Sequence, residues 1–111
     1  MSTEKGVKLD NGKNRLGLVL SGFSHALWLV GSVGTFGANK YTDNGWQEVE
    51  NGRNRYLDAL LRHLFKVFMG EETDKESGLP HMAHVCWNAL AILELTVHEK
   101  SNNQLKDDIL K

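Results

Sequence analysis

The feature that most constrains the fold is a long apolar segment after Pro80, which three polar residues interrupt at helical spacing. His81, His84 and Asn88 are three and four residues apart, so in an α-helix they share an arc of about 60°. Apolar residues occupy most of the remaining circumference, which is typical of a central helix in a small domain. Burying a polar group without a partner costs about 1–3 kcal/mol. The stripe therefore predicts partners for these side chains: other residues, water, a metal or a ligand.

An uncharged stretch, residues 16–36, contains the first predicted helix. Its apolar residues recur at spacings of three and four, at positions 20, 23, 27 and 30. We expect the glycines at 31, 34 and 37 to weaken this helix and to end it. The stretch is long enough to cross a bilayer. Its glycines, its hydroxyl side chains and His25 instead favour a buried helix, so we expect no membrane contact.

The rest of the chain alternates polar segments with one more helical pattern. Residues 38–55 are rich in Asn, Gly and charge and predict a long loop, a kind of segment that often carries function. A second helix is expected from residue 54 or 55 to about Met69, with Gly70 as its stop. The acidic segment 71–78 predicts a loop, and the third helix follows it from Pro80 to about His98.

The two ends complete an all-α prediction. Residues 1–15 are polar and predict a flexible lead-in, and residues 105–111 predict a short C-terminal helix. Residues 16–111 then form one all-α domain with three main helices and a long loop between the first two. A chain of 111 residues buries only a modest core, and its first helix is rich in glycine, so we expect a homo-oligomer.

Composition excludes several function classes. The net charge of −1 argues against binding to polymeric nucleic acid, which needs a basic face. Cys86 is the only cysteine, so neither an intramolecular disulfide nor a CxxC metal site can form. The first residues lack the apolar core of a signal peptide, which leads us to expect a cytoplasmic protein. The phosphate-binding GxxxxGK[ST] loop, the GxGxxG fingerprint and the serine-hydrolase elbow do not occur.

The second helix and the acidic loop offer partners for the polar stripe. If the second and third helices pack antiparallel, Arg62 and His63 approach His81 and His84. The acidic loop hangs over the same end and can supply a carboxylate from Glu71, Glu72 or Asp74. Imidazole and carboxylate together can bind a divalent cation, and arginine and lysine can bind phosphate. The pattern predicts a site that handles nucleotides, although spacing alone does not specify it.

Several short motifs make the chain similar to a known family. Residues 14–95 resemble the phage-associated family named for dATP/dGTP diphosphohydrolases, with relatives in phages that replace adenine by 2-aminoadenine. The motifs that carry the resemblance are Gly37-Ala38, Lys40-Tyr41, Trp46, Arg55-Tyr56, Arg62-His63, Gly70-Glu71, Asp74, Ser77-Gly78, His81, His84 and Trp87-Asn88. The resemblance implies an all-α protein that hydrolyses a purine deoxynucleoside triphosphate to the monophosphate and pyrophosphate, assisted by a divalent metal.

The candidate residues and this activity together lead to a hypothesis about the role of each residue. The metal, Mg²⁺, Mn²⁺ or Zn²⁺, would be held by members of one set: His63, His81, His84, Glu71 and Asp74. Catalytic roles fall to three of these residues, His63, His84 and Asp74. A second set would bind the substrate. Its cations, Lys40, Arg55 and Arg62, would hold phosphate, and its aromatic rings, Tyr41 and Trp46, would stack on the base. The amide of Asn88 would orient a histidine or a ligand hydroxyl. For Trp46, core packing is an equal alternative to base stacking.

One departure keeps other functions open. The wider all-α pyrophosphohydrolases hold Mg²⁺ through ExxE and ExxD pairs, and this chain has no clean copy of that pattern. The pair His81-x-x-His84 occupies a comparable place, which permits a different metal or a site that binds without cutting. The first alternative is therefore a phage protein that sequesters a signalling nucleotide unchanged. The second is a scaffold role, in which the polar stripe is satisfied internally.

Overall fold

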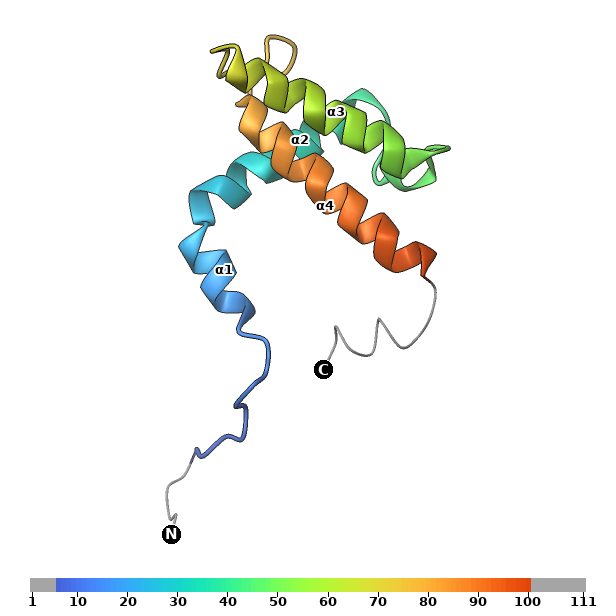
Figure 1. Cartoon of the computed structure of the whole chain (residues 1–111). Helices are drawn as coiled ribbons and strands as arrows, with labels where there is room; N and C mark the ends of the chain where they lie inside the picture. The colour runs from blue at the N-terminus through green and yellow to red at the C-terminus, as the bar shows by residue number, and fades with distance from the viewer. Residues whose placement is uncertain (1–5, 101–111) are drawn as a thin grey trace.

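Residues 6–100 are described here in a computed structural model of the chain, shown in Figure 1. They form four α-helices and one 3-10 helix: α1 (Leu16–Gly22), α2 (Ser24–Lys40), η1 (Gly45–Glu48), α3 (Gly52–Phe68) and α4 (His81–Glu99). Within these residues the only extended pairing is an isolated bridge between Thr73 and Pro80. The predicted all-α class is confirmed.

The centre of the fold is an antiparallel pair formed by α3 and α4, which make the most extensive contact in the described chain. Gly52 at the start of α3 lies against Leu95 near the end of α4. His63, near the other end of α3, contacts His81 at the start of α4. The predicted bounds of these two helices agree with the observed bounds to within three residues.

An aromatic cluster joins this pair to η1 and α2. Trp46, Tyr56 and Trp87 meet edge to face, with ring centroids 5.6–6.3 Å apart. The Tyr56 hydroxyl donates a 2.6 Å hydrogen bond to the Trp46 carbonyl. At Gly34 of α2, a Cβ atom would stand 3.3 Å from the indole nitrogen of Trp87. The missing side chain therefore lets α2 approach α4 closely.

The predicted end of the first helix at its glycines is wrong. The segment forms two helices, which meet at Phe23, and the second continues through Gly31, Gly34 and Gly37 to Lys40. Glycine costs about 1 kcal/mol in a helix relative to alanine. The contact between Gly34 and Trp87 gives at least one of these glycines a packing role that offsets this cost.

The connection that follows is shorter than predicted, because it spans residues 41–51 instead of 38–55 and contains η1. Asn44 and Asn51, the residues before η1 and α3, adopt left-handed backbone conformations with φ of 54° and 57°. Asparagine tolerates this conformation better than most residues. These two turns, rather than a long irregular loop, bring Trp46 back onto α3.

The N-terminal helices form an arm that projects from the α3–α4 pair (Figure 1). No single helix within residues 6–100 combines the length and apolar character needed to cross a bilayer. Taken together, α1 and α2 have that length and composition, but they are bent by 87° relative to each other. Residues 6–15 form turns and extended chain before α1. The division into a lead-in and one domain stays a prediction, and the predicted helix at 105–111 lies outside the described residues.

Candidate functional site

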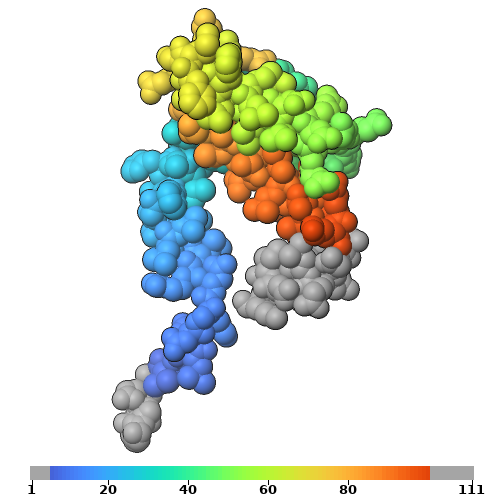
Figure 2. Space-filling model, viewed as in Figure 1, coloured from blue at the N-terminus to red at the C-terminus, as the bar shows by residue number. Residues whose placement is uncertain are grey.

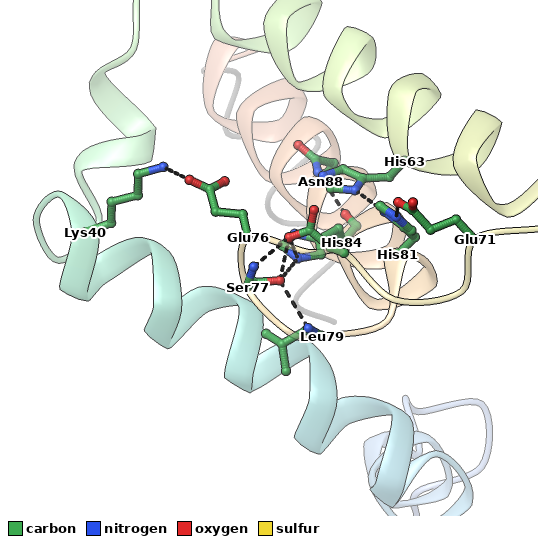
Figure 3. A network of polar contacts seen from close by, with 10 residues as sticks. Lys40, His63, Glu71, Glu76, Ser77, Leu79, His81, His84 and Asn88 are labelled. Carbon is green, nitrogen blue, oxygen red and sulfur yellow. Dashed lines mark hydrogen bonds and ion pairs between the residues drawn. The ribbon is translucent and has the colours of Figure 1, made fainter.

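Three histidines meet between α3 and α4, as Figure 3 shows. The Nδ1 atoms of His63 and His81 are 2.8 Å apart. The rings of His63 and His84 stack in nearly parallel planes, 4.3 Å between centroids. His81 is only 2% exposed and His84 8%, so the polar stripe of α4 is buried. The helix pair thus brings His63 onto both α4 histidines, which is the arrangement expected from the sequence for the case that the two helices pack antiparallel.

A carboxylate fixes the outer side of His81. Its Nε2 lies 2.7 Å from an Oε atom of Glu71. An ionised carboxylate only accepts hydrogen bonds, so Nε2 carries the proton. In neutral His81 the Nδ1 atom is then an acceptor, and His63 donates its Nδ1 proton to it. This pairing of a carboxylate with a histidine resembles the outer support found behind metal-binding histidines.

A serine connects His84 to Asp74. The Ser77 Oγ atom lies 2.7 Å from Asp74 Oδ2 and 2.7 Å from His84 Nε2. Ser77 has one hydroxyl proton, which it donates to the carboxylate, so His84 Nε2–H donates to Ser77. The remaining proton acceptor of the neutral His84 ring is therefore Nδ1. Asp74 also accepts the backbone N–H of Ser77 at 2.9 Å.

The loop between α3 and α4 holds the two carboxylates in place by folding back on itself. The Asp74 and His81 backbone N–H groups donate to the carbonyls of Leu79 and Glu72, both at 2.8 Å. The loop enters and leaves through Gly70 and Gly78, whose φ angles are +91° and +74°. Glycine adopts this conformation without the strain that a side chain would bring. The acidic loop is thus a defined turn rather than a loose connection.

The third buried polar residue, Asn88, is satisfied within its own helix. Its side-chain nitrogen donates a 2.8 Å hydrogen bond to the His84 carbonyl. No side-chain nitrogen or oxygen buried in the described residues lacks a hydrogen-bond partner. The partners that the stripe demands are therefore present, and Asn88 supports the helix turn that carries His84.

Burial and charge tune the protonation of this cluster. Burial lowers the pKa of His63 and of His84, and for His63 the neighbouring His84 adds to the effect. The hydrogen bond from His81 lowers the pKa of Glu71. Burial alone would raise the pKa of Asp74, but the two hydrogen bonds from Ser77 lower it overall. Near neutral pH, His63 and His84 are uncharged and the two carboxylates are ionised.

These shifts predict that the folded chain loses stability on mild acidification. The unfolded chain takes up protons on its imidazoles near pH 6.5, whereas folded His63 and His84 do so only at lower pH. The unfolded state binds more protons in that window. The contribution of these two histidines to the free energy of unfolding is therefore fully present above pH 6.5 and is lost as the pH falls below that value. Urea unfolding between pH 5.5 and 8 measures this, well above the range where carboxylates titrate.

A matched pair of variants assigns the effect. In His84→Asn the pH dependence should be weaker, whereas the exposed His98→Asn should keep it. A wild-type stability that rises on acidification from pH 8 to 5.5 contradicts the assignment.

One part of the cluster has a donor set that fits a metal ion. A ring nitrogen from each of His63 and His81 and a carboxylate oxygen of Asp74 lie within 4.8 Å of one another. Two neutral imidazoles and one carboxylate suit Zn²⁺, Mn²⁺ and similar ions better than Mg²⁺, which prefers oxygen ligands. The Glu71–His81 hydrogen bond orients one of these rings from behind.

Two predicted substrate residues lie at the edge of the same loop. Lys40, at the end of α2, forms an ion pair with Glu76 (Figure 3), the neighbour of Ser77. Its ammonium group is 5.4 Å from the centre of the Tyr41 ring. Tyr41 itself is 74% exposed. The ion pair thus ties the end of α2 to the loop that carries Asp74.

The other predicted substrate residues are more dispersed. Arg62 is exposed beside the cluster, and its charge contributes to the lowered pKa of His63. Arg55 is exposed near the start of α3, two helical turns before His63. Trp46 belongs to the aromatic cluster, where Tyr56 and Trp87 contact its ring. Of these residues, Arg62 lies beside the histidine cluster, whereas Trp46 packs against other aromatic rings.

Two polar residues at the site were not predicted as site residues. Ser77 joins Asp74 to His84, and Lys66 lies close enough to Glu71 for its charge to lower the pKa of that carboxyl. A signal for the first was present, because Asp and Ser side chains in a loop often close turns by hydrogen bonding to nearby backbone groups. For Lys66, the helical period alone placed it on a solvated face.

The chain was compared with known proteins. The dATP/dGTP diphosphohydrolase N-terminal family matches residues 3–106. A dATP/dGTP diphosphohydrolase of Salmonella phage PMBT28 is 32% identical over 103 residues, which are 93% of this chain and 32% of that protein. The chain therefore spans about a third of the length of this relative. No solved structure matches the chain. On the extent of the family match, the chain belongs to the dATP/dGTP diphosphohydrolase N-terminal family.

Proposed function

We propose that this chain carries the metal and phosphate site of an enzyme that hydrolyses a purine deoxynucleoside triphosphate to the monophosphate and pyrophosphate. Family membership and the name of the phage relative support the substrate class. Because the chain spans about a third of that relative, the activity of the whole protein is part of the proposal. The observation that carries it is the convergence of His63, His81 and Asp74 between α3 and α4.

His63, His81 and Asp74 would hold the divalent ion, and Glu71 would orient His81. When bound, the ion supplies charge neutralisation at the α-phosphate and a more acidic water molecule. His84 is the proton acceptor in this scheme, because its Nε2–H is directed to Ser77 and its Nδ1 atom keeps a lone pair. Water oxygen bonds to the α-phosphorus, the bond from that phosphorus to the bridging oxygen breaks, and pyrophosphate leaves.

Exposed cations around the cluster would bind the triphosphate. Arg62 and Lys66 flank it on α3, and Lys40 stands at its loop edge. Together they offset the negative charge that grows on the leaving pyrophosphate. Tyr41, exposed beside Lys40, would stack on the base. Arg55 would contact the outer end of the substrate.

The experiment is to incubate the purified chain with dATP, dGTP, dCTP and dTTP in the presence of Mg²⁺, Mn²⁺ or Zn²⁺. We expect pyrophosphate and monophosphate from the purine nucleotides in at least one metal. Release of orthophosphate, or no turnover with any metal, contradicts the proposal. Recovery of unchanged nucleotide from the denatured chain would instead support the sequestering role.

A positioning role for Ser77 gives a separate prediction. Ser77→Ala removes the hydroxyl that joins Asp74 to His84 and accepts the Leu79 N–H. Loss of outer support for a metal site typically costs about 10- to 100-fold in metal affinity or activity, and we expect a loss in that range. Ser77→Thr, which keeps the hydroxyl, should restore much of it. Equal losses in both variants would contradict a role through the hydroxyl.

A further inference from the structure

A hollow opens at the end of the α3–α4 pair that lies away from the histidine cluster. It has a volume of about 360 Å³ and lies between η1, the start of α3 and the end of α4. Figure 2 shows the start of α3, in green, beside the end of α4, in red, at the surface of the molecule. Gly52, in the hollow, and His63, in the cluster, are about 16 Å apart along α3. The hollow is therefore a separate feature, and its volume is within the range of small-molecule pockets, about 300–1,000 Å³.

Part of the lining of this hollow is apolar. Val49 and Leu95 line it and are half-buried. Gly52 is buried, and a Cβ atom there would stand 3.2 Å from Leu95 Cδ1. The missing side chain thus lets the start of α3 approach Leu95 closely. Apolar lining with a few polar groups is typical of sites that hold the ring of a small molecule.

Side-chain amides make up much of the polar lining. Asn54 Nδ2 donates a 3.0 Å hydrogen bond to Asn51 Oδ1, which fixes these two side chains relative to each other. Asn51 keeps its amide protons as donors, and Asn54 keeps its carbonyl oxygen as an acceptor. Within residues 6–100, the side chain of Gln47, which also lines the hollow, makes no hydrogen bond. The lining therefore offers donors and acceptors side by side.

The charges at the hollow are paired. Arg53 and Glu99 form an ion pair with 2.6 Å between Nε and a carboxylate oxygen. His98 lies 2.8 Å from a carboxylate oxygen of Glu94. No arginine or lysine in the described lining lacks a carboxylate partner. This lining suits an uncharged polar group better than a phosphate chain, which binds most strongly to arginine and lysine.

We propose that this hollow binds the adenine base of a nucleoside or nucleotide, at a site separate from the histidine cluster. A side-chain amide recognises adenine through two hydrogen bonds, because its oxygen accepts from N6 and its nitrogen donates to N7. Gln47 makes this contact, and Val49 and Leu95 contact the face of the ring. Guanine presents two acceptors at the corresponding positions and pairs with arginine or lysine, but Arg53 is held by Glu99.

The test is a titration of the ¹⁵N-labelled chain with deoxyadenosine in EDTA, followed by NMR. A ligand without phosphate, in a solution without free metal, leaves the chemistry of the histidine cluster unused. We expect saturable shifts of the Gln47 side-chain amide and of the Gly52 backbone N–H. Deoxyguanosine should bind at least about fivefold more weakly. The monophosphate dAMP should bind about as well as deoxyadenosine, because the only arginine in the lining is paired.

Matched variants assign the contact. Gln47→Met nearly keeps the size of the side chain but removes the amide, and should weaken binding at least about fivefold. Glu48→Met, in the same helix η1 but outside the hollow, should bind as the wild type does. Asn51→Gly keeps the left-handed backbone and should also weaken binding, whereas the same change at Asn44, the other left-handed asparagine, should not.

The histidine cluster supplies the last control. His81→Ala should bind deoxyadenosine as the wild type does, so failure of the metal site and failure of the adenine site are separate results. The proposal is overturned by the absence of saturable shifts at Gln47 and Gly52, or by equal affinity for the two nucleosides. Unchanged affinity in Gln47→Met overturns it as well, and so does loss of binding in a folded His81→Ala chain.

Discussion

Replacing His81 by alanine is expected to abolish metal-dependent release of pyrophosphate, with a loss of at least about a hundredfold in kcat/KM. The substitution removes the hydrogen-bond partner of His63 Nδ1 and also the hydrogen bond that His81 makes to Glu71. What remains near the proposed metal is one imidazole and one carboxylate, too few ligands to hold an ion firmly. Pyrophosphate release under saturating metal measures the effect.

The same helix provides the control for this prediction. His98 pairs with Glu94 at 2.8 Å, much as His81 pairs with Glu71, but it is largely exposed. His98→Ala should therefore retain wild-type turnover. Circular dichroism should show unchanged helix content in both variants, which separates loss of the site from loss of the fold. Full turnover by His81→Ala would remove this residue from the site.

Replacing Trp87 by alanine is expected to lower the free energy of unfolding by about 3 kcal/mol. Trp87 is half-buried and contacts Trp46, Tyr56 and the backbone of α2 at Gly34, so its loss opens a cavity where three elements meet. In a domain of about 100 residues such a loss lowers Tm by roughly 10–20 °C. Thermal and urea unfolding followed by circular dichroism both report it.

Trp28 makes a matched control, because it is 79% exposed on α2. Trp28→Ala should change the free energy of unfolding by no more than about 0.5 kcal/mol. Equal destabilisation by the two substitutions would show that the aromatic cluster is not the centre of the core.

Local pattern was sufficient where a helix buries one side against a neighbour. The bounds of α3 and α4 followed from apolar spacing, and Gly70 marked the end of the first of them. Packing decided the rest. The glycines of α2 weaken a helix in isolation. The compensating gain, close packing of the α2 backbone at Gly34 against Trp87, involves a residue far away in sequence. The end of that helix could not be read from propensity alone.

The candidate site divides in a similar way. His81, His84 and Asn88 stood out because they are polar residues in an apolar helix, and burial confirms that contrast. The acidic loop offered several carboxylates of similar chemistry. Only its turn, closed by backbone hydrogen bonds, selects Glu71 for His81 and Asp74 for Ser77. A one-dimensional pattern holds no information about which loop carboxylate reaches which ring.

The measurement that bears most directly on the central claim is a titration of the metal-free chain with Co²⁺, followed by visible absorption, with Zn²⁺ competition. We predict one tightly bound ion per chain, displaced by Zn²⁺ and lost in both His63→Ala and His81→Ala, while His98→Ala binds as the wild type does. Absence of binding, or binding that both cluster substitutions leave unchanged, would contradict the assignment of a metal site to His63, His81 and Asp74.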